Sequence, residues 1–330
     1  MKVTACLRYE AGSMMGGGEL QALDTMGALA ELGVETEFYN VLNRQFGDVV
    51  HFYGSMPYYH DLGQFLKQSK VPYVVSSIFV SRRSGLRLRV KRTLSKLQGA
   101  YPKHIRRLLM GAERIFTLSA LEERNLVDVF GSDLPRRIRA PIGIDERFHR
   151  PDPTLFRDRF GEGTFILHTG SYSERKGQMA LIRAARGMDV RLVFAGRVHE
   201  RPYYEQCVAA SSQGTVFLTD LAKEDPLLPA AYAAAEAFVL PSEAEILSAS
   251  ALEAAVAGCR LVLSDSWGAE EFFGTDAEYV NASSPAAVRA GLQRALARTH
   301  MRQAQGDAFF ERFQWRKVAK AILAQYEEIV

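Results

Sequence analysis

Short apolar runs and amphipathic segments alternate along almost the whole chain. Several runs, such as RLVFAG and AFVLP, are continuously apolar, which is typical of parallel strands covered on both faces. The alternation of strands and helices therefore predicts an α/β protein built from doubly wound parallel sheets. The predicted strands cover residues 3–7, 34–39, 49–53, 73–79, 114–118, 137–140, 165–169, 190–195, 215–218, 237–240 and 260–264, and the predicted helices cover 19–32, 178–186, 226–236 and 251–257.

The segment PIGIDERFHRPDPTLFRDRFGEG, residues 141–163, interrupts this alternation. It is rich in Pro, Asp and Arg and has no long periodic pattern, so we expect the boundary between two domains near its start. The first domain is expected over 1–145 and the second over 146–314. After residue 284 the chain reads as helical, and the final amphipathic helix, 315–330, is expected to return to the first domain.

Composition is consistent with two domains of a soluble protein. The chain has 330 residues, of which 47% are hydrophobic and 24% charged. No apolar run approaches the about 18 residues of a membrane-spanning helix, and the first residues lack the features of a signal peptide. Cys6, Cys207 and Cys259 lack metal-site spacing, so we expect reduced thiols in a cytoplasmic protein.

The stretch LPSEAEILSASALEAAVAG, residues 240–258, carries three carboxylates and no Lys or Arg. An unpaired carboxylate beside a buried helix is costly, so each needs a partner. Ser250 and Glu253 have the spacing of a capping box, which would explain Glu253 structurally. Glu245 lies beyond the end of a predicted strand, where open α/β sheets bind ligands. A nucleotide-sugar, with hydroxyls at both ends and phosphates between, would suit both carboxylates.

Two further segments suggest phosphate binding. GSMMGGGELQ, residues 12–21, places glycines between a strand and a helix, although it fits neither the dinucleotide fingerprint nor the Walker motif, and a plain flexible turn explains it equally well. HTGSYSERKG, residues 168–177, brings Arg175 and Lys176 to the start of a helix. Cations at the start of a helix are unfavourable because they oppose the helix dipole, and a bound phosphate would make the arrangement favourable. The plain alternative is a solvated loop with two exposed cations.

Taken in order, these motifs resemble one family, the retaining glycosyltransferases of family 4, over most of the chain. Glu245 and Glu253 have the E-x7-E spacing, and PSEAE stands where the family has Pro-Ser-x-x-Glu. PIGID, GSYSERKG and GGGE resemble its other motifs. The resemblance implies the GT-B fold, in which two doubly wound Rossmann-like domains face a central cleft.

The resemblance also implies roles for individual residues. Glu253 would bind the ribose hydroxyls, Glu245 the hydroxyls of the donor sugar, and Lys176 the diphosphate, with Glu245 and Lys176 as the catalytic pair. Both carboxylates would then have ligand hydroxyls, rather than cations, as partners. The other implied donor-binding residues are Leu247, Ser248 and Ala249 for the diphosphate, Gly17 and Gly18 for the phosphates from the first domain, and Leu218 and Thr219 for the base.

Three positions depart from the family pattern. Ser171 stands where the family has an Arg, so Arg175 or Arg197 would have to supply that charge. Ile246-Leu247-Ser248 replaces Gly-Phe-Gly, and no His occurs near Ser77 or Ile78, where the family has one. A nucleotide-sugar-binding protein without catalysis is therefore one alternative. A nucleotide-sugar epimerase on the same fold is another, against which the E-x7-E motif speaks.

The expected activity is hexosyl transfer with retention from a UDP- or GDP-sugar to a glycan, lipid-linked or other small hydroxyl acceptor, as in polysaccharide biosynthesis. The donor is a substrate, so no cofactor is expected. The chain has no Asp-x-Asp, which indicates a metal-independent reaction. Positioning and charge stabilisation would do the work, without a protein nucleophile.

The tract 81–112 contains no Asp or Glu and many Lys and Arg, among them Arg82, Arg83, Arg87 and Arg89. Such a segment can contact an anionic membrane at the cytoplasmic face or a phosphorylated acceptor. A solvated face is the plain alternative. Nucleic acid is not expected, because Tyr101 is the tract's one aromatic residue available for base stacking.

Overall fold

The computed structural model describes residues 1–9, 16–42, 45–79, 100–219, 221–299 and 302–330. The chain divides into two compact units, here called the N-terminal and the C-terminal unit. The N-terminal unit comprises Met1–Gly143 and Phe313–Val330, and the C-terminal unit comprises Ile144–Arg312. Each unit contains one six-stranded parallel sheet, so the predicted α/β class with two doubly wound sheets is confirmed.

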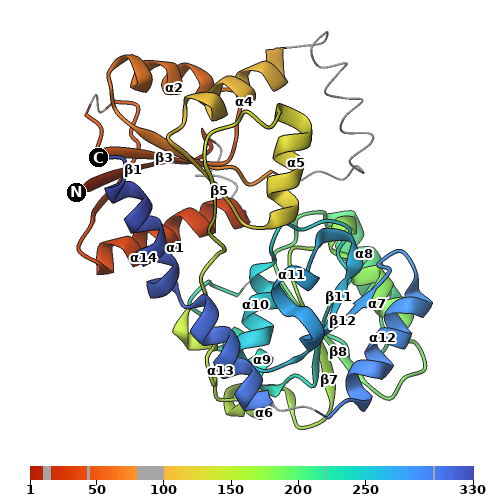
Figure 1. The fold of residues 1–330 in the computed structure, drawn as a ribbon. Helices are drawn as coiled ribbons and strands as arrows, with labels where there is room; N and C mark the ends of the chain where they lie inside the picture. The colour runs from red at the N-terminus through yellow and green to blue at the C-terminus, as the bar shows by residue number, and fades with distance from the viewer. Residues whose placement is uncertain (10–15, 43–44, 80–99, 220, 300–301) are drawn as a thin grey trace. The chain divides into compact units, whose positions relative to one another are not determined.

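The sheet of the N-terminal unit has the order β2-β1-β3-β4-β5-β6. Its helices cover both faces, with α1 and α14 on one side and α2, α4 and α5 on the other (Figure 1). The strands are β1 (Lys2–Cys6), β2 (Glu35–Phe38), β3 (Val49–Tyr53), β4 (Tyr73–Ser76), β5 (Arg114–Thr117) and β6 (Arg137–Arg139), and the helices are α1 (Gly17–Glu31), α2 (Tyr59–Gln68), α4 (Ala100–Gly111), α5 (Ala120–Phe130) and α14 (Trp315–Glu327).

A buried histidine ties the C-terminal helix α14 to this sheet. His51 of β3 is fully buried; its Nδ1 lies 2.6 Å from the Tyr326 hydroxyl and its Nε2 2.8 Å from the Ser76 hydroxyl. Burial lowers the pKa of His51 to about 3, so the ring is neutral at physiological pH. The last helix of the chain is therefore an integral part of the N-terminal unit's core.

The sheet of the C-terminal unit has the order β12-β11-β10-β7-β8-β9. The chain runs from β7 to β8 on one side and later returns to β10 on the other, so β7 and β10 flank the topological switch point. The strands are β7 (Phe165–Thr169), β8 (Arg191–Ala195), β9 (Val216–Leu218), β10 (Ala237–Leu240), β11 (Arg260–Ser264) and β12 (Ala277–Val280).

Helices also cover both faces of this second sheet. Alternate residues of β10 point to opposite faces: Ala237 and Val239 pack with α7, α8 and α12, while the ring of Phe238 lies 5.9 Å from that of Tyr232 in α9. The helices are α6 (Thr154–Phe160), α7 (Gln178–Ala184), α8 (Arg201–Ala210), α9 (Leu227–Ala234), α10 (Ala249–Val256), α11 (Glu270–Phe273), α12 (Pro285–Ala297) and α13 (Arg302–Phe313), with short 3-10 turns η2 (Glu146–Phe148) and η3 (Glu174–Lys176).

Several elements were not predicted from the sequence, namely the strand β12 and the helices α2, α4, α5, α6, α8 and α11, and two of them show why. The edge strand β12 has the sequence AEYV, in which only Ala277 and Val280 are buried, so it lacks the nearly continuous apolar run of strands such as β8 and β10. Helix α6 lies inside the segment 141–163, and Phe156 is its one buried residue. A helix with a single buried position shows no 3.6-residue periodicity, so no helix was predicted there.

The described part of the basic tract behaves as an ordinary surface helix. Ile105, Leu108 and Leu109 of α4 are buried in the core of the N-terminal unit, so this apolar face is not available to a membrane. Arg106 bonds to the Asp133 carboxylate and, at 2.9 Å, to the Phe130 carbonyl. The predicted membrane contact thus gains no support from residues 100–112, and Arg82, Arg83, Arg87 and Arg89 lie outside the described residues.

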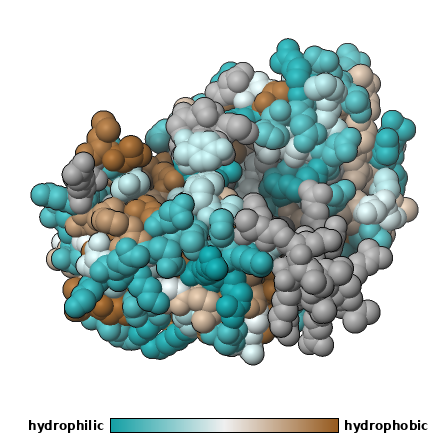
Figure 2. Space-filling view, turned by 90° about the horizontal axis from the view of Figure 1, so that it is seen from above, coloured by the Kyte–Doolittle hydropathy of each residue, from teal (hydrophilic) through white to brown (hydrophobic). Residues whose placement is uncertain are grey.

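The surface is predominantly polar where it can be seen. Figure 2 shows one face on which hydrophilic residues predominate and hydrophobic ones gather in a few separate patches. Scattered exposed apolar side chains of this kind are usual for a globular protein. Among the residues that the structure describes, no helix has the length and apolar character needed to cross a membrane.

The return of the chain to the N-terminal unit depends on close packing at Gly143. A Cβ atom at Gly143 would lie 2.3 Å from Cδ2 of Trp315, the first residue of α14. Gly143 does not have a positive φ, so its backbone would accept alanine and the indole ring alone excludes it. Gly27, exposed inside α1, offers a contrast, because a Cβ there meets nothing within 4 Å.

We expect Gly143→Ala to lower the free energy of unfolding by about 1–3 kcal/mol, the usual cost of overpacking. Gly27→Ala is the matched control and should raise it by about 0.5–1 kcal/mol, because alanine loses less entropy in a helix than glycine. Urea denaturation followed by far-UV circular dichroism measures both. Equal stability of the Gly143→Ala variant and the wild type would show that α14 does not pack here as described.

Candidate functional site

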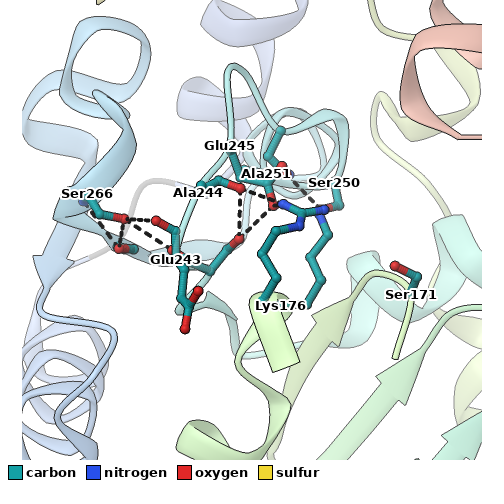
Figure 3. Close-up of polar contacts among 12 residues, drawn as sticks. Ser171, Lys176, Glu243, Ala244, Glu245, Ser250, Ala251 and Ser266 are labelled. Atoms are coloured by element: carbon teal, nitrogen blue, oxygen red, sulfur yellow. Dashed lines mark hydrogen bonds and ion pairs between the residues drawn. The ribbon is translucent and has the colours of Figure 1, made fainter. Parts of the chain in front are cut away.

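Two loops meet at the switch point of the C-terminal unit. The loop after β7 carries Arg175 and Lys176 in η3, and the loop after β10 carries Glu245. Because β7 and β10 are adjacent and parallel, their carboxyl ends lie at the same edge of the sheet. Glu245 Oε1 lies 2.6 Å from Lys176 Nζ and 3.1 Å from Arg175 Nη1 (Figure 3).

Glycine makes this approach possible. Gly177 ends η3 with φ 77°, in the left-handed region, and a Cβ there would lie 2.2 Å from the Pro241 carbonyl oxygen. The Glu243 N–H then donates to the Arg175 carbonyl at 2.9 Å, and Arg175 Nη1 donates to the Ala244 carbonyl at 2.5 Å. The two loops are thus joined through the backbone as well as through the charged side chains.

Glu245 is held in its ionised form. Its side chain is only 12% exposed, and the Ser242 hydroxyl donates to Oε1 at 2.7 Å. Burial by itself would raise the pKa of Glu245, but the charges of Lys176 and Arg175 and the hydrogen bonds from Lys176 and Ser242 outweigh it, so the pKa lies below the ordinary value. The expectation that Glu245 lacks a cationic partner was wrong.

Among the described residues, three side chains donate hydrogen bonds to the Glu245 carboxylate, and all three reach the same oxygen. Lys176, Arg175 and Ser242 reach Oε1, and among the described residues Oε2 has no hydrogen-bond partner. The exposed side chain of Glu243 points away from Lys176 in Figure 3 and does not join the cluster. Two cations against one carboxylate leave one net positive charge, so the cluster combines an acceptor oxygen with a site that attracts anions.

Glu253 is placed by different means. Helix α10 has Ser248 as its N-cap, and the Ser248 hydroxyl accepts from the Ala251 N–H at 3.3 Å. The interpretation of Ser250 and Glu253 as a capping box was therefore wrong, because Glu253 does not stand three residues after the N-cap. Instead the Tyr232 hydroxyl donates to Glu253 Oε2 at 2.8 Å. Near the start of α10, Leu247 and Ser248 are buried and Ala249 is exposed.

The predicted base and charge residues lie along the next strands. Gly196 approaches Gly170 closely, since a Cβ on Gly196 would lie 2.0 Å from the Gly170 carbonyl oxygen, and its N–H donates to the Leu218 carbonyl at 2.9 Å. Beyond these strand ends is a cavity of about 560 Å³. Its lining includes the predicted residues Arg197 and Thr219, together with Val198, Arg201, Tyr204, Leu221 and Ala222.

Arg197 therefore lines the same cavity as Thr219, whereas Arg175 lies beside Lys176 and Glu245 in the ion-pair cluster. Figure 3 shows Ser171 apart from the contact between Lys176 and Glu245. Among the described residues, no group of three or more His, Cys, Asp or Glu side chains is arranged to hold a metal ion.

Gly17 and Gly18 belong to the N-terminal unit, where they open α1. A Cβ on Gly18 would lie 3.1 Å from Cδ1 of Ile78, a residue with φ 44°, which is uncommon for a β-branched side chain. The buried carboxylate of Glu122 fixes this turn by accepting from the Ser77 hydroxyl and, at 2.8 Å, from the Phe79 N–H. This turn, at Ser77 and Ile78, is the position at which the sequence lacks the His expected from the family resemblance.

The residues that hold the site residues in place were not predicted from the sequence. Ser242, Tyr232 and Glu122 each bond to a group named above. The signal for Tyr232 was a lone aromatic hydroxyl within the alanine run AAYAAAEAF, and that for Ser242 its place directly before the carboxylates. Neither pattern shows by itself which side chain it meets.

Comparison with known proteins agrees with this geometry. Residues 163–298 match the family described as Glycosyl transferases group 1, so the resemblance to that group is confirmed for this part of the chain. A D-inositol 3-phosphate glycosyltransferase of Geodermatophilus obscurus is 28% identical over 239 residues, which are 65% of this chain and 52% of that protein. The chain thus spans about half the length of the curated relative that it matches.

Solved structures support the fold. A sucrose-phosphate synthase from Thermosynechococcus elongatus has a TM-score of 0.77 at 16% identity, with 99% of this chain and 98% of that one covered. The Anabaena protein HepE, solved with UDP and glucose, has a TM-score of 0.73 at 16% identity, covering 99% and 100%. An E. coli protein solved with UDP-2-fluoro glucose has 0.72 at 12% identity and full coverage of both, 100% each. These similarities confirm the GT-B fold.

The ion pair predicts a pH-dependent stability difference between wild type and Glu245→Gln. Because the pKa of Glu245 is lowered on folding, its contribution is present above the unfolded value of about 4.3 and is lost as the pH falls through the folded value. At pH 7 we expect Glu245→Gln to be less stable by about 1–3 kcal/mol. The difference should shrink at pH 3.5, as measured by urea unfolding.

Glu205→Gln is the control, because Glu205 pairs with Arg201 on the surface with both side chains exposed. Such pairs contribute little, so this variant should resemble wild type at both pH values. A Glu245→Gln difference that stays constant or grows at pH 3.5 would contradict the ionised, cation-paired state of Glu245.

Proposed function

Because residues 163–298 match the group 1 glycosyltransferases, we propose that the protein is a retaining glycosyltransferase that takes its sugar from a UDP- or GDP-sugar. The observation that carries the proposal is the environment of Glu245. Its Oε1 is held by Lys176, Arg175 and Ser242, while Oε2 has no partner among the described residues. In this proposal a hydroxyl of the donor sugar donates to Oε2.

The diphosphate binds where the positive charge gathers. Lys176 and Arg175 leave one net positive charge beside Glu245. The first turn of α10 adds backbone N–H groups that have no intrahelical partner, and its dipole favours an anion; Leu247, Ser248 and Ala249 form this end of the helix. The proposal thus assigns the charge supplied by the family's Arg to Arg175, since Ser171 cannot supply it.

The nucleoside extends from the diphosphate on the β8 and β9 side. The cavity of about 560 Å³ lined by Arg197 and Thr219 lies within the usual size range of ligand pockets, and Thr219 directly follows Leu218, the last residue of β9. The base binds there in this proposal, and the ribose hydroxyls donate to Glu253. Gly17 and Gly18 approach the donor phosphates.

The reaction proceeds without a protein nucleophile. The acceptor hydroxyl attacks the anomeric carbon on the face from which the diphosphate leaves; the new C–O bond forms as the sugar–phosphate bond breaks, and the leaving phosphate oxygen takes the acceptor's proton. Lys176 and Arg175 stabilise the charge that develops on the leaving group, and Glu245 orients the sugar. The acceptor is a glycan, a lipid-linked sugar or another small hydroxyl compound, in a cytoplasmic, metal-independent reaction.

Replacement of Glu245 by Gln tests the proposal. The variant should transfer sugar from its preferred donor at least tenfold more slowly, because the carboxylate acts on the sugar, while its dissociation constant for the free nucleoside diphosphate changes much less. Glu243→Gln is the matched control, since Glu243 is two residues away, exposed and outside the cluster. Donors are first found by a thermal-shift screen over UDP-, GDP- and ADP-sugars.

The true donor at 100 times its dissociation constant should stabilise the protein by about 2.7 kcal/mol. Binding without transfer or slow donor hydrolysis would instead indicate a nucleotide-sugar-binding protein, and conversion of the donor without an acceptor would indicate an epimerase. Equal effects of the Glu245 and Glu243 substitutions would contradict the role given to Glu245. Activity that is lost to EDTA and restored by magnesium or manganese would contradict the metal-independent reaction.

A further inference from the structure

Two hydroxyl groups in the C-terminal unit form a hydrogen-bonded chain that reaches the carboxylate of Glu253. The Tyr232 hydroxyl lies 2.5 Å from the Thr169 hydroxyl and donates to Glu253 Oε2 at 2.8 Å. Thr169 ends β7, Tyr232 lies in α9 and Glu253 in α10, so the chain joins three elements at the carboxyl edge of the sheet. Tyr232 is fully buried.

The direction of each hydrogen bond follows from the groups involved. A carboxylate has no proton to give, so Tyr232 must donate to Glu253, and the Tyr232 oxygen is then left to accept from Thr169. Burial and the neighbouring carboxylate hold the pKa of Tyr232 well above its ordinary value, so the hydroxyl keeps its proton at physiological pH. A charged acceptor also makes the bond to Glu253 stronger than one between neutral groups.

The phenol is held rigidly enough to orient Glu253. Its ring packs edge-to-face against Phe148, with centroids 5.7 Å apart, and lies 5.9 Å from the Phe238 ring. The Tyr232 carbonyl accepts from Arg302 Nη2 at 2.7 Å and from Cys259 Sγ at 3.1 Å. With both ends of Tyr232 fixed, its hydroxyl is a rigid donor that holds Oε2 of Glu253.

We propose that Tyr232 is a positioning residue that, supported by Thr169, orients the carboxylate of Glu253 toward the ribose hydroxyls of the donor nucleotide. This inference rests on the proposed function, because it assigns Glu253 a ribose contact. Tyr232 does not touch the ligand and acts through Glu253. Holding the carboxylate in one rotamer before the ligand arrives reduces the entropy that binding must cost.

Loss of a hydroxyl with a purely structural role should lower stability without changing nucleotide affinity. Tyr326 serves as the comparison for Tyr232. Tyr326 is also fully buried, and its hydroxyl bonds to His51 in the N-terminal unit. Tyr326→Phe should lower stability and leave nucleotide affinity unchanged. If Tyr232 were only structural, Tyr232→Phe would behave in the same way.

The test measures the binding of UDP and GDP by isothermal titration calorimetry and donor kinetics with the sugar nucleotide found active. Tyr232→Phe should bind the preferred diphosphate about tenfold more weakly, because the Glu253 carboxylate is no longer held in one rotamer before the ligand binds. Its donor KM should rise while kcat changes little, because the ribose contact is the same in the ground and transition states. The double variant with Glu253→Gln should bind no more weakly than Glu253→Gln alone.

The variants Thr169→Val and Thr169→Ser provide a second test, which can still be carried out if Tyr232→Phe does not fold. The Val variant loses the hydroxyl that donates to Tyr232 and should bind the diphosphate more weakly, whereas the Ser variant keeps it and should bind as wild type does. Equal affinity in both Thr169 variants would overturn the inference.

Two results separate this inference from the proposed function. Wild-type protein that binds UDP or GDP, with affinity lowered by Glu253→Gln but not by Tyr232→Phe, would overturn the inference and leave the proposed function standing. Additive losses in the double variant would also overturn it, because Tyr232 would not act through Glu253. Wild-type protein that binds neither diphosphate would overturn the proposed function, and the inference with it.

Discussion

A carboxylate buried at the edge of a sheet must be balanced by charge, and the C-terminal unit is arranged to balance one. Glu245 becomes stable there only because β7 and β10 are neighbours and the loop after β7 brings Lys176 within 2.6 Å of it. That approach needs the left-handed backbone of Gly177 and its missing Cβ beside Pro241. The ion pair at the switch point thus depends on the strand order, on both loops and on Gly177 together.

Different side chains donate to the two carboxylates of the site. Glu245 is surrounded by cations, which suits a position beside a diphosphate. Glu253 instead receives the neutral hydroxyl of Tyr232, and its ligand contact in this account is with neutral ribose hydroxyls. In the proposed function, surroundings rather than residue type distinguish the carboxylate that binds the sugar from the one that binds the ribose.

The sequence predicted what depends on local pattern and missed what depends on distant contacts. Strands such as β8 and β10 were found because their apolar runs are nearly continuous, whereas β12 mixes buried Ala277 and Val280 with half-exposed residues. Arg175 and Lys176 stand 70 and 69 residues before Glu245, so their types were visible and their meeting was not. Ser248 and Ser250 stand two residues apart at the start of α10, and local pattern could not decide which of them caps it.

The central claim is that a nucleotide-sugar binds at the carboxyl ends of β7 and β10. Hydrogen–deuterium exchange with and without the donor tests this most directly, because bound ligand slows exchange in the segments that it contacts. If the ligand contacts the loops after β7 and β10, hydrogen exchange should be slower in peptides covering 170–178 and 241–253 and unchanged in α12. Slower exchange confined to other segments, at saturating concentration of the UDP- or GDP-sugar that stabilises the protein, would contradict it.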